Sequence, residues 1–261
     1  MPVSEPTILD LPDEAAAEVA ALARAMQRAN GPFMRFLNSL GGKVEDRLDL
    51  LPVQVRDGLT TMTAGILEQV YRAAAVVAGH RAVPKADARL HRMAAMVSGA
   101  AGGAAGLGSA LVELPATVAL IFGAMQKAAG EEGFDPASEE VRVICLDILG
   151  SGGPGAADDG VNTGFLGARL GLSGSAIHAV IARVAPRFAT MLGQKLASQT
   201  VPILGAAAGA GVNFMFMDYF QAMARVRFGL RRLALEHGEE PVREAFSAEI
   251  ARSVTAPDPA G

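Results

Sequence analysis

Cysteine, tryptophan and tyrosine are nearly missing from this chain of 261 residues, which contains one cysteine, no tryptophan and two tyrosines. A single cysteine, Cys145, excludes a disulfide within the chain and any metal site built from several thiolates. Hydrophobic residues make up 51% of the chain but aromatic residues only 5%, so the apolar content is mostly aliphatic and small. Small side chains allow helix backbones to approach one another closely.

Signatures of common enzyme classes are missing as well. The sequence contains no Gly-x-Ser-x-Gly elbow for a nucleophilic serine and no Gly-x-x-x-x-Gly-Lys-Ser/Thr loop for nucleotide phosphates. The four histidines, at positions 80, 91, 178 and 237, are too far apart in the sequence to indicate a zinc site. We therefore predict no metal site and no cofactor, and the sequence assigns no catalytic residue.

An excess of positive charge is also lacking. The chain has 23 Lys and Arg against 27 Asp and Glu, a net charge of −4, which argues against nucleic acid as the main partner. The N-terminus is acidic and has neither the basic start nor the apolar run of a signal peptide. If the protein contacts a membrane, we expect it to do so from the cytoplasmic side.

Helical patterns fill most of the chain, and no segment of useful length alternates with period two. Asn30-Gly31-Pro32 and Pro186 predict helix ends, and Asp135-Pro136 predicts a capped helix start. We predict an all-α fold, a single multi-helix bundle with helices near 13–29, 32–40, 52–79, 85–96, 137–149, 175–184, 187–199, 212–236 and 239–252.

Two stretches rich in glycine and alanine, 93–112 and 196–217, carry no charged residue. We call them the two apolar runs, and the first continues past Glu113 to Gln126. We predict that both form helices nested at the centre of the bundle. Run 93–112 is long enough to cross a bilayer, but its six strong hydrophobes contribute only about −3 kcal/mol. A membrane span and a buried or surface-inserting hairpin both remain open.

Glycines four residues apart recur in both apolar runs. Four residues separate positions on one helical face, so each pair makes a flat groove. The groove is a packing surface for a neighbouring helix, or it admits a lipid chain. The glycines concerned are Gly99, Gly102, Gly103, Gly106, Gly205 and Gly209.

A few polar residues lie in or beside the apolar runs. A carboxylate in a dry environment must be paired or protonated, so we expect Glu113 to pair with Lys195 or Arg187 inside the bundle. The group is either a structural ion pair or a polar site at the mouth of an apolar cavity. The candidate site residues are Glu113, Lys195, Gln199, Asn213 and Asp218.

Arginines crowd one short stretch near the C-terminus, among phenylalanines. We consider Arg225, Arg231 and Arg232 as contacts for lipid head groups, because arginine beside phenylalanine suits an anionic bilayer surface. With Arg227, however, the charges are spread around the helix, which favours a solvated helix face.

An ordered set of short motifs resembles the EcsC family of bacterial proteins. The set covers roughly residues 50–245 and leaves about the first 45 outside. One position departs from it, since Tyr219 stands where many members carry histidine. The motifs are Glu113-Leu114-Pro115, Gly133-Phe134-Asp135, Thr163-Gly164-Phe165-Leu166-Gly167, Gln194-Lys195-Leu196-Ala197-Ser198-Gln199 and Asp218-Tyr219-Phe220.

The resemblance implies a mostly helical architecture and a link to membranes, since the family takes its name from a protein encoded beside an ABC transporter. We expect an N-terminal helical extension over 1–45, an EcsC-like helical domain over 46–252 and a disordered tail over 253–261. Our leading hypothesis is a cytoplasmic protein, peripheral to the inner membrane, that binds lipid or a membrane protein such as an ABC transporter. A soluble hydrolase-like enzyme with a site near Glu113 and Lys195, and a non-catalytic helical scaffold, are the alternatives.

Overall fold

The computed structural model describes residues 11–39, 53–79, 107–151, 174–198 and 205–255. Within these ranges all regular structure is α-helical and no strand occurs, so the predicted all-α class is confirmed. The helices are α1 (Asp13–Ser39), α3 (Val53–Gly79), α5 (Leu107–Glu131), α6 (Glu139–Ser151), α7 (Gly174–Ser198), α8 (Gly205–His237) and α9 (Glu239–Thr255).

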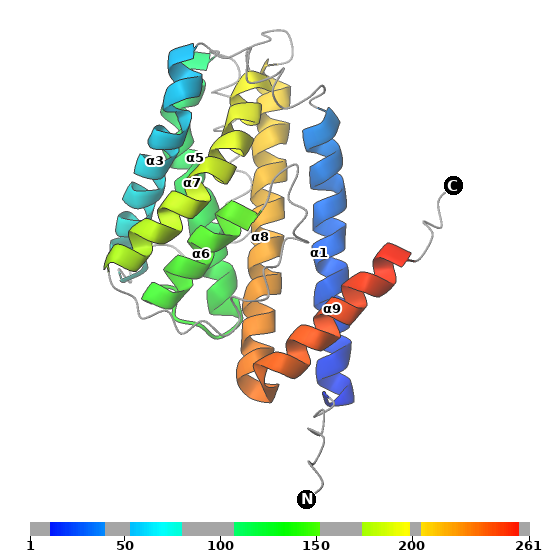
Figure 1. Ribbon diagram of the computed structural model, residues 1–261. Helices are drawn as coiled ribbons and strands as arrows, with labels where there is room; N and C mark the ends of the chain where they lie inside the picture. The colour runs from blue at the N-terminus through cyan, green and yellow to red at the C-terminus, as the bar shows by residue number, and fades with distance from the viewer. Residues whose placement is uncertain (1–10, 40–52, 80–106, 152–173, 199–204, 256–261) are drawn as a thin grey trace, which may run out of the picture.

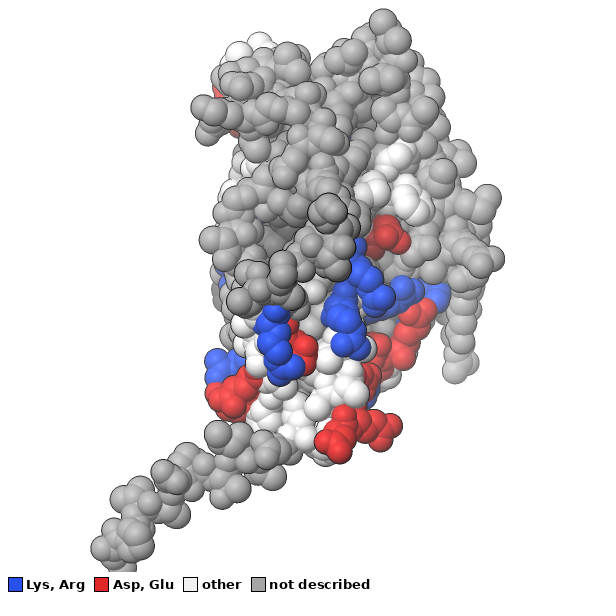
Figure 2. Space-filling view, turned by 90° about the vertical axis from the view of Figure 1, so that its right-hand side faces the viewer, with Lys and Arg blue, Asp and Glu red and all other residues white. Residues whose placement is uncertain are grey.

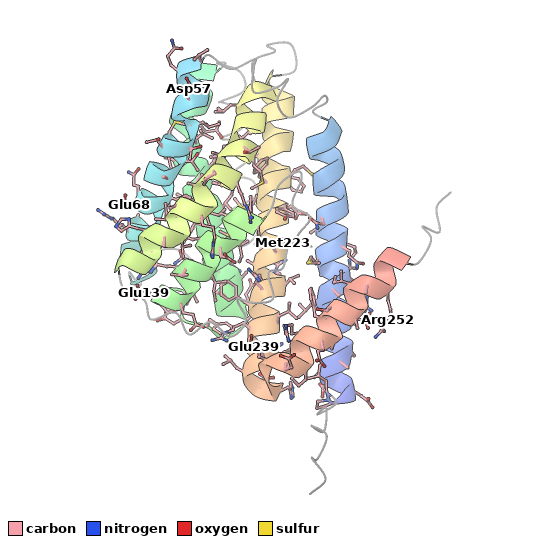
Figure 3. All side chains as sticks on the ribbon, viewed as in Figure 1. Asp57, Glu68, Glu139, Met223, Glu239 and Arg252 are labelled. Carbon is pink, nitrogen blue, oxygen red and sulfur yellow. The ribbon has the colours of Figure 1, made fainter. Side chains whose placement is uncertain are left out.

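Helix α8 lies at the centre of the bundle (Figure 1). It packs against α5 and α6 on one side and against α1 and α9 on the other, while α3 packs against α5, α6 and α7. Their buried apolar side chains form one continuous core, with Val19 from α1, Leu67 from α3, Phe122 from α5 and Phe220 from α8. Figure 3 shows side chains from the surrounding helices filling the space around α8 near Met223.

The connection between α5 and α6 shows how local sequence ends one helix and starts the next. Gly133, with φ +86°, follows α5, where Phe134 N–H bonds to Ala129 C=O and Gly133 N–H to Gly130 C=O, a Schellman cap. The predicted start of the next helix at Asp135-Pro136 is early. Asp135 accepts a bond from Ala137 N–H in the preceding turn, whereas Ser138 Oγ accepts from Val141 N–H and caps α6.

Two predicted helix ends at prolines are wrong. Helix α1 continues through Asn30-Gly31-Pro32 to Ser39, and α7 continues through Pro186 to Ser198. A proline removes one backbone hydrogen bond, but its φ is compatible with a helix. In α7, Pro186 is on the exposed side, where water can bond the carbonyl that the proline leaves without a donor. Packing of the helix as a whole therefore outweighs one lost bond.

The described residues of the second apolar run belong to two helices. They are divided between the end of α7 and the start of α8, with residues 199–204 outside the described ranges. From the first run, the structure describes the part from Leu107 onward, which begins α5. Gly99, Gly102, Gly103, Gly106 and Gln199 lie outside the described residues, as do the predicted domain division at 45/46 and residues 256–261 of the predicted tail.

Close helix contacts at glycine occur at positions outside the apolar runs. A Cβ added to Gly150 of α6 would lie 2.8 Å from Val184 Cγ2 of α7, and one added to Gly229 of α8 would lie 3.0 Å from Leu22 Cδ1 of α1. Gly211, in the second run, has nothing within 4 Å of such an atom. Gly150 and Gly229 thus permit close approach of two helices at positions outside the apolar runs.

Candidate functional site

Three helix ends meet at one end of the bundle. The first turns of α5 and α8 and the last turn of α7 lie together at the top of Figure 1. Glu113 lies in the second turn of α5, Lys195 near the end of α7 and Asn213 in the third turn of α8. The two apolar runs therefore reach the bundle at the same end.

One carboxylate oxygen joins these helices. Glu113 Oε1 accepts hydrogen bonds from Asn213 Nδ2 at 2.7 Å and Thr117 Oγ1 at 2.8 Å, and Lys195 Nζ lies 3.4 Å from it. We call these four residues the Glu113 cluster. The predicted ion pair of Glu113 with Lys195 is confirmed, whereas the alternative partner, Arg187, is exposed on α7.

The Glu113 cluster is almost completely removed from water. The Lys195 side chain is 1% exposed and that of Glu113 8%. Burial lowers the pKa of Lys195 from its ordinary value, because desolvation disfavours the ammonium, and the negative charge of Glu113 offsets only part of this effect. Among the described residues, Glu113 Oε2 is buried without a hydrogen-bond partner.

Asp218 is not among the described residues that bond to Glu113. Asp218 lies on α8, five residues after Asn213, and is half-buried. Gly205 and Gly209 lie in the first two turns of α8, where their spacing puts them on one face. The contacts shown at Glu113 thus select Lys195 and Asn213 from the predicted set and add Thr117, which follows Glu113 by one helical turn.

The three arginines considered for head groups all form ion pairs within the chain. Arg225 Nε lies 3.6 Å from Glu131, and both Arg231 Nε and Nη2 bond Glu140 Oε1 at 3.1 and 3.0 Å. Arg232 bonds Glu132 at 3.2 Å, and also pairs with Glu18 of α1 and with Glu236. These guanidinium groups connect α8 to α1, to α6 and to the end of α5.

Sequence reasoning missed a second buried ion pair. Asp147 of α6 accepts hydrogen bonds from Arg227 of α8 at Oδ2 and, at 2.8 Å, from Arg183 of α7 at Oδ1. The Arg227 side chain is 3% exposed and that of Asp147 12%. An available signal was Asp147 itself, since it is the one charged residue within the apolar stretch Val143–Gly150.

Two further titratable groups are buried in the core. Burial raises the pKa of the Cys145 thiol well above its ordinary value, so the side chain packs as a small hydrophobe. Burial also raises the pKa of Tyr219 to about 12, and its ring meets Phe220 edge-on. Neither group is ionised near neutral pH.

Among the described residues, the helices lack a stretch long and apolar enough to cross a membrane. No curated protein and no solved structure matches the chain. The family model of the EcsC protein family matches residues 17–233, from the second turn of α1 almost to the end of α8. The match therefore starts about 30 residues earlier than the motifs indicated. It includes α1, whose buried face belongs to the common core. Because the match covers most of its length, the chain belongs to the EcsC protein family.

Proposed function

We propose that this protein is membrane-associated and binds membrane lipid or a membrane protein, acting from the cytoplasm at the surface of the inner membrane. An ABC transporter is one candidate for the membrane protein. The observation that carries this proposal is the meeting of the two apolar runs at one end of the bundle, where Glu113 ties α5, α7 and α8 together. The described parts of both runs at that end carry no charged residue.

The exposed hydrophobic side chains on the described surface also support the apolar runs as the parts that contact lipid. Its exposed large hydrophobic side chains are two isolated ones, Val53 and Leu235. Scattered single side chains of this kind are ordinary on a protein surface, whereas contact with lipid needs a contiguous apolar area. The apolar runs are therefore the parts of the sequence suited to that contact.

Within this proposal the Glu113 cluster has a structural role. A catalytic group must touch its substrate, and the side chains of Lys195 and Glu113 are 1% and 8% exposed. A buried ion pair with further hydrogen bonds fixes the relative positions of the helices that contribute to it. The cluster would hold the ends of α5, α7 and α8 in fixed relative positions.

Co-sedimentation with vesicles tests the proposal. The full chain is mixed with vesicles of phosphatidylcholine, and with vesicles of phosphatidylcholine and phosphatidylglycerol in equal parts. We expect sedimentation with at least the second kind, and lipid that co-purifies with the protein from cells. A chain that stays in the supernatant with both kinds of vesicle and carries no lipid does not bind lipid.

If lipid binding fails, crosslinking in intact cells distinguishes the second part of the proposal. A membrane-protein partner should give a crosslinked product that sediments with the membrane fraction. Absence of both lipid binding and such a product refutes membrane association altogether.

A further inference from the structure

Helix α7 carries positive charge without any negative charge. Its 25 residues include Arg183, Arg187 and Lys195 but no aspartate or glutamate. Lys195 is buried in the Glu113 cluster, so its charge does not reach the surface. The charge that α7 presents to solvent therefore comes from the two arginines, which are one helical turn apart.

The exposed side chains of α7 form a regular stripe. They recur in pairs every four residues, so they lie along one side of the helix. We call this stripe the α7 outer face. Its members are His178, Ala179, Ala182, Arg183, Pro186 and Arg187.

The acidic group that bonds Arg183 is shared with a second arginine. Asp147 bonds Arg183 at 2.8 Å, but it also pairs with the buried Arg227. One carboxylate thus serves two guanidinium groups. Arg183 remains 55% exposed in this arrangement, and Arg187 is exposed one turn further along.

Several other described surfaces combine the two signs of charge. Figure 2 shows basic and acidic side chains close together on the face that α1 and α9 contribute to. On α8, Arg225, Arg231 and Arg232 are each paired with glutamate. On α3, Arg72 is paired with Glu68. The α7 outer face differs because its exposed positions include cations, small apolar residues and no acid.

We propose that the α7 outer face lies against an anionic lipid surface. This inference rests on the proposed function and names the part of the protein and the lipid charge involved. Small alanine and proline side chains let the helix approach the head groups, while Arg183 and Arg187 bond lipid phosphates. The last turn of α7 begins the second apolar run at Leu196, so a basic face and an uncharged run adjoin.

The test compares two charge-matched double variants of the full chain. Arg183→Gln/Arg187→Gln removes two charges from the α7 outer face. Arg24→Gln/Arg28→Gln removes two exposed charges at the same spacing from α1. Binding to vesicles of phosphatidylcholine and phosphatidylglycerol in equal parts should fall about 30-fold in the first variant, since each basic residue near such a surface contributes about 1 kcal/mol. The second variant should bind like the unmodified chain.

Two further variants separate charge from folding. Arg183→Lys/Arg187→Lys keeps the charge and should keep most of the binding. Arg187→Gln alone leaves the contact of Arg183 with Asp147 intact and should reduce binding about 5-fold, at an unchanged melting temperature. Unmodified protein should also lose affinity as salt is raised, because screening weakens attraction between exposed charges.

The outcomes distinguish this inference from the function on which it rests. Equal binding of all variants to anionic vesicles, or equal loss in the α7 and α1 variants, overturns the role of the α7 outer face while lipid binding stands. If Arg183→Gln/Arg187→Gln abolishes crosslinking to an acidic membrane protein but leaves vesicle binding unchanged, the α7 outer face contacts that protein and not lipid. This result also overturns the inference. If the unmodified chain binds neither kind of vesicle, the proposed lipid binding has failed and this inference fails with it.

Discussion

The buried pair of Glu113 and Lys195 makes a quantitative prediction about stability. A double-mutant cycle uses Glu113→Gln, Lys195→Met and the combination, because these changes remove charge while nearly preserving shape. At 3.4 Å, with an effective dielectric constant of about 20, the Coulomb attraction between two unit charges is about 5 kcal/mol. Each single change leaves one buried charge without its partner, and this typically costs about 3–5 kcal/mol.

The double variant should be less destabilised than the sum of the two single variants. It buries no charge at this position, so the desolvation cost of both groups disappears along with their attraction. We expect a coupling free energy of about 3 kcal/mol or more. Urea unfolding followed by circular dichroism measures it, and each kcal/mol should move the melting temperature by roughly 2–4 °C in a protein of this size.

An exposed pair of the same charge types provides the control. Lys127 and Glu131 are four residues apart on α5, with side chains 30% and 42% exposed, and their coupling should stay below about 1 kcal/mol. The cycle there is Lys127→Met, Glu131→Gln and the combination. If the coupling between Glu113 and Lys195 is no larger than that between Lys127 and Glu131, the argument that burial makes the first pair strong is wrong.

Three further predictions concern packing, a second ion pair and pH. Gly150→Ala should lower the free energy of unfolding by about 1–3 kcal/mol in urea unfolding, because the added Cβ would lie 2.8 Å from a methyl group of Val184. Gly58→Ala is the control: nothing lies within 4 Å of the added Cβ, so this change should stabilise α3 slightly. Asp147→Asn should cost about 3 kcal/mol in the same assay, because Arg227 is buried against that carboxylate; a loss below about 1 kcal/mol would contradict this. Between the lowered pKa of Lys195 in the folded protein and its ordinary value of 10.5, the unfolded chain binds the proton that the folded protein has released, so the free energy of unfolding should rise with pH. Lys195→Met should remove that contribution, and an identical pH profile in both proteins would contradict it.

Local sequence predicted the helical class well and several helix ends poorly. The periodicity of apolar residues identified the helices now seen as α3, α6 and α9 to within a few residues. Pro32 and Pro186 misled because a helix break is a local tendency, whereas the continuous helices α1 and α7 are stabilised along their length by packing. The Schellman cap at Gly133, in contrast, is fixed by local backbone geometry, and the helix does end there.

The candidate site was predictable in part. A carboxylate at the edge of an uncharged run needs a partner, and the sequence limited that partner to Lys195 or Arg187. The structure selected Lys195. The hydrogen bonds from Asn213 and Thr117 could not be assigned in the same way, because several polar residues near the runs were equally eligible. Asp147 and Arg227 are 80 residues apart and became partners only through the crossing of α6 and α8.

The sequence by itself determined three things. The protein is helical, it contains two uncharged runs whose starts are about a hundred residues apart, and a charged side chain beside these runs must be neutralised. Those conclusions follow from residue periodicity and from the cost of burying a charge, neither of which depends on the arrangement of the helices. Tertiary structure alone decided that α8 lies between α1 and α5, that the arginines of α8 are paired inside the chain, and that those of α7 face outward. Which side of a helix meets solvent depends on the neighbours that cover its other sides, and the order of residues along one helix does not specify them.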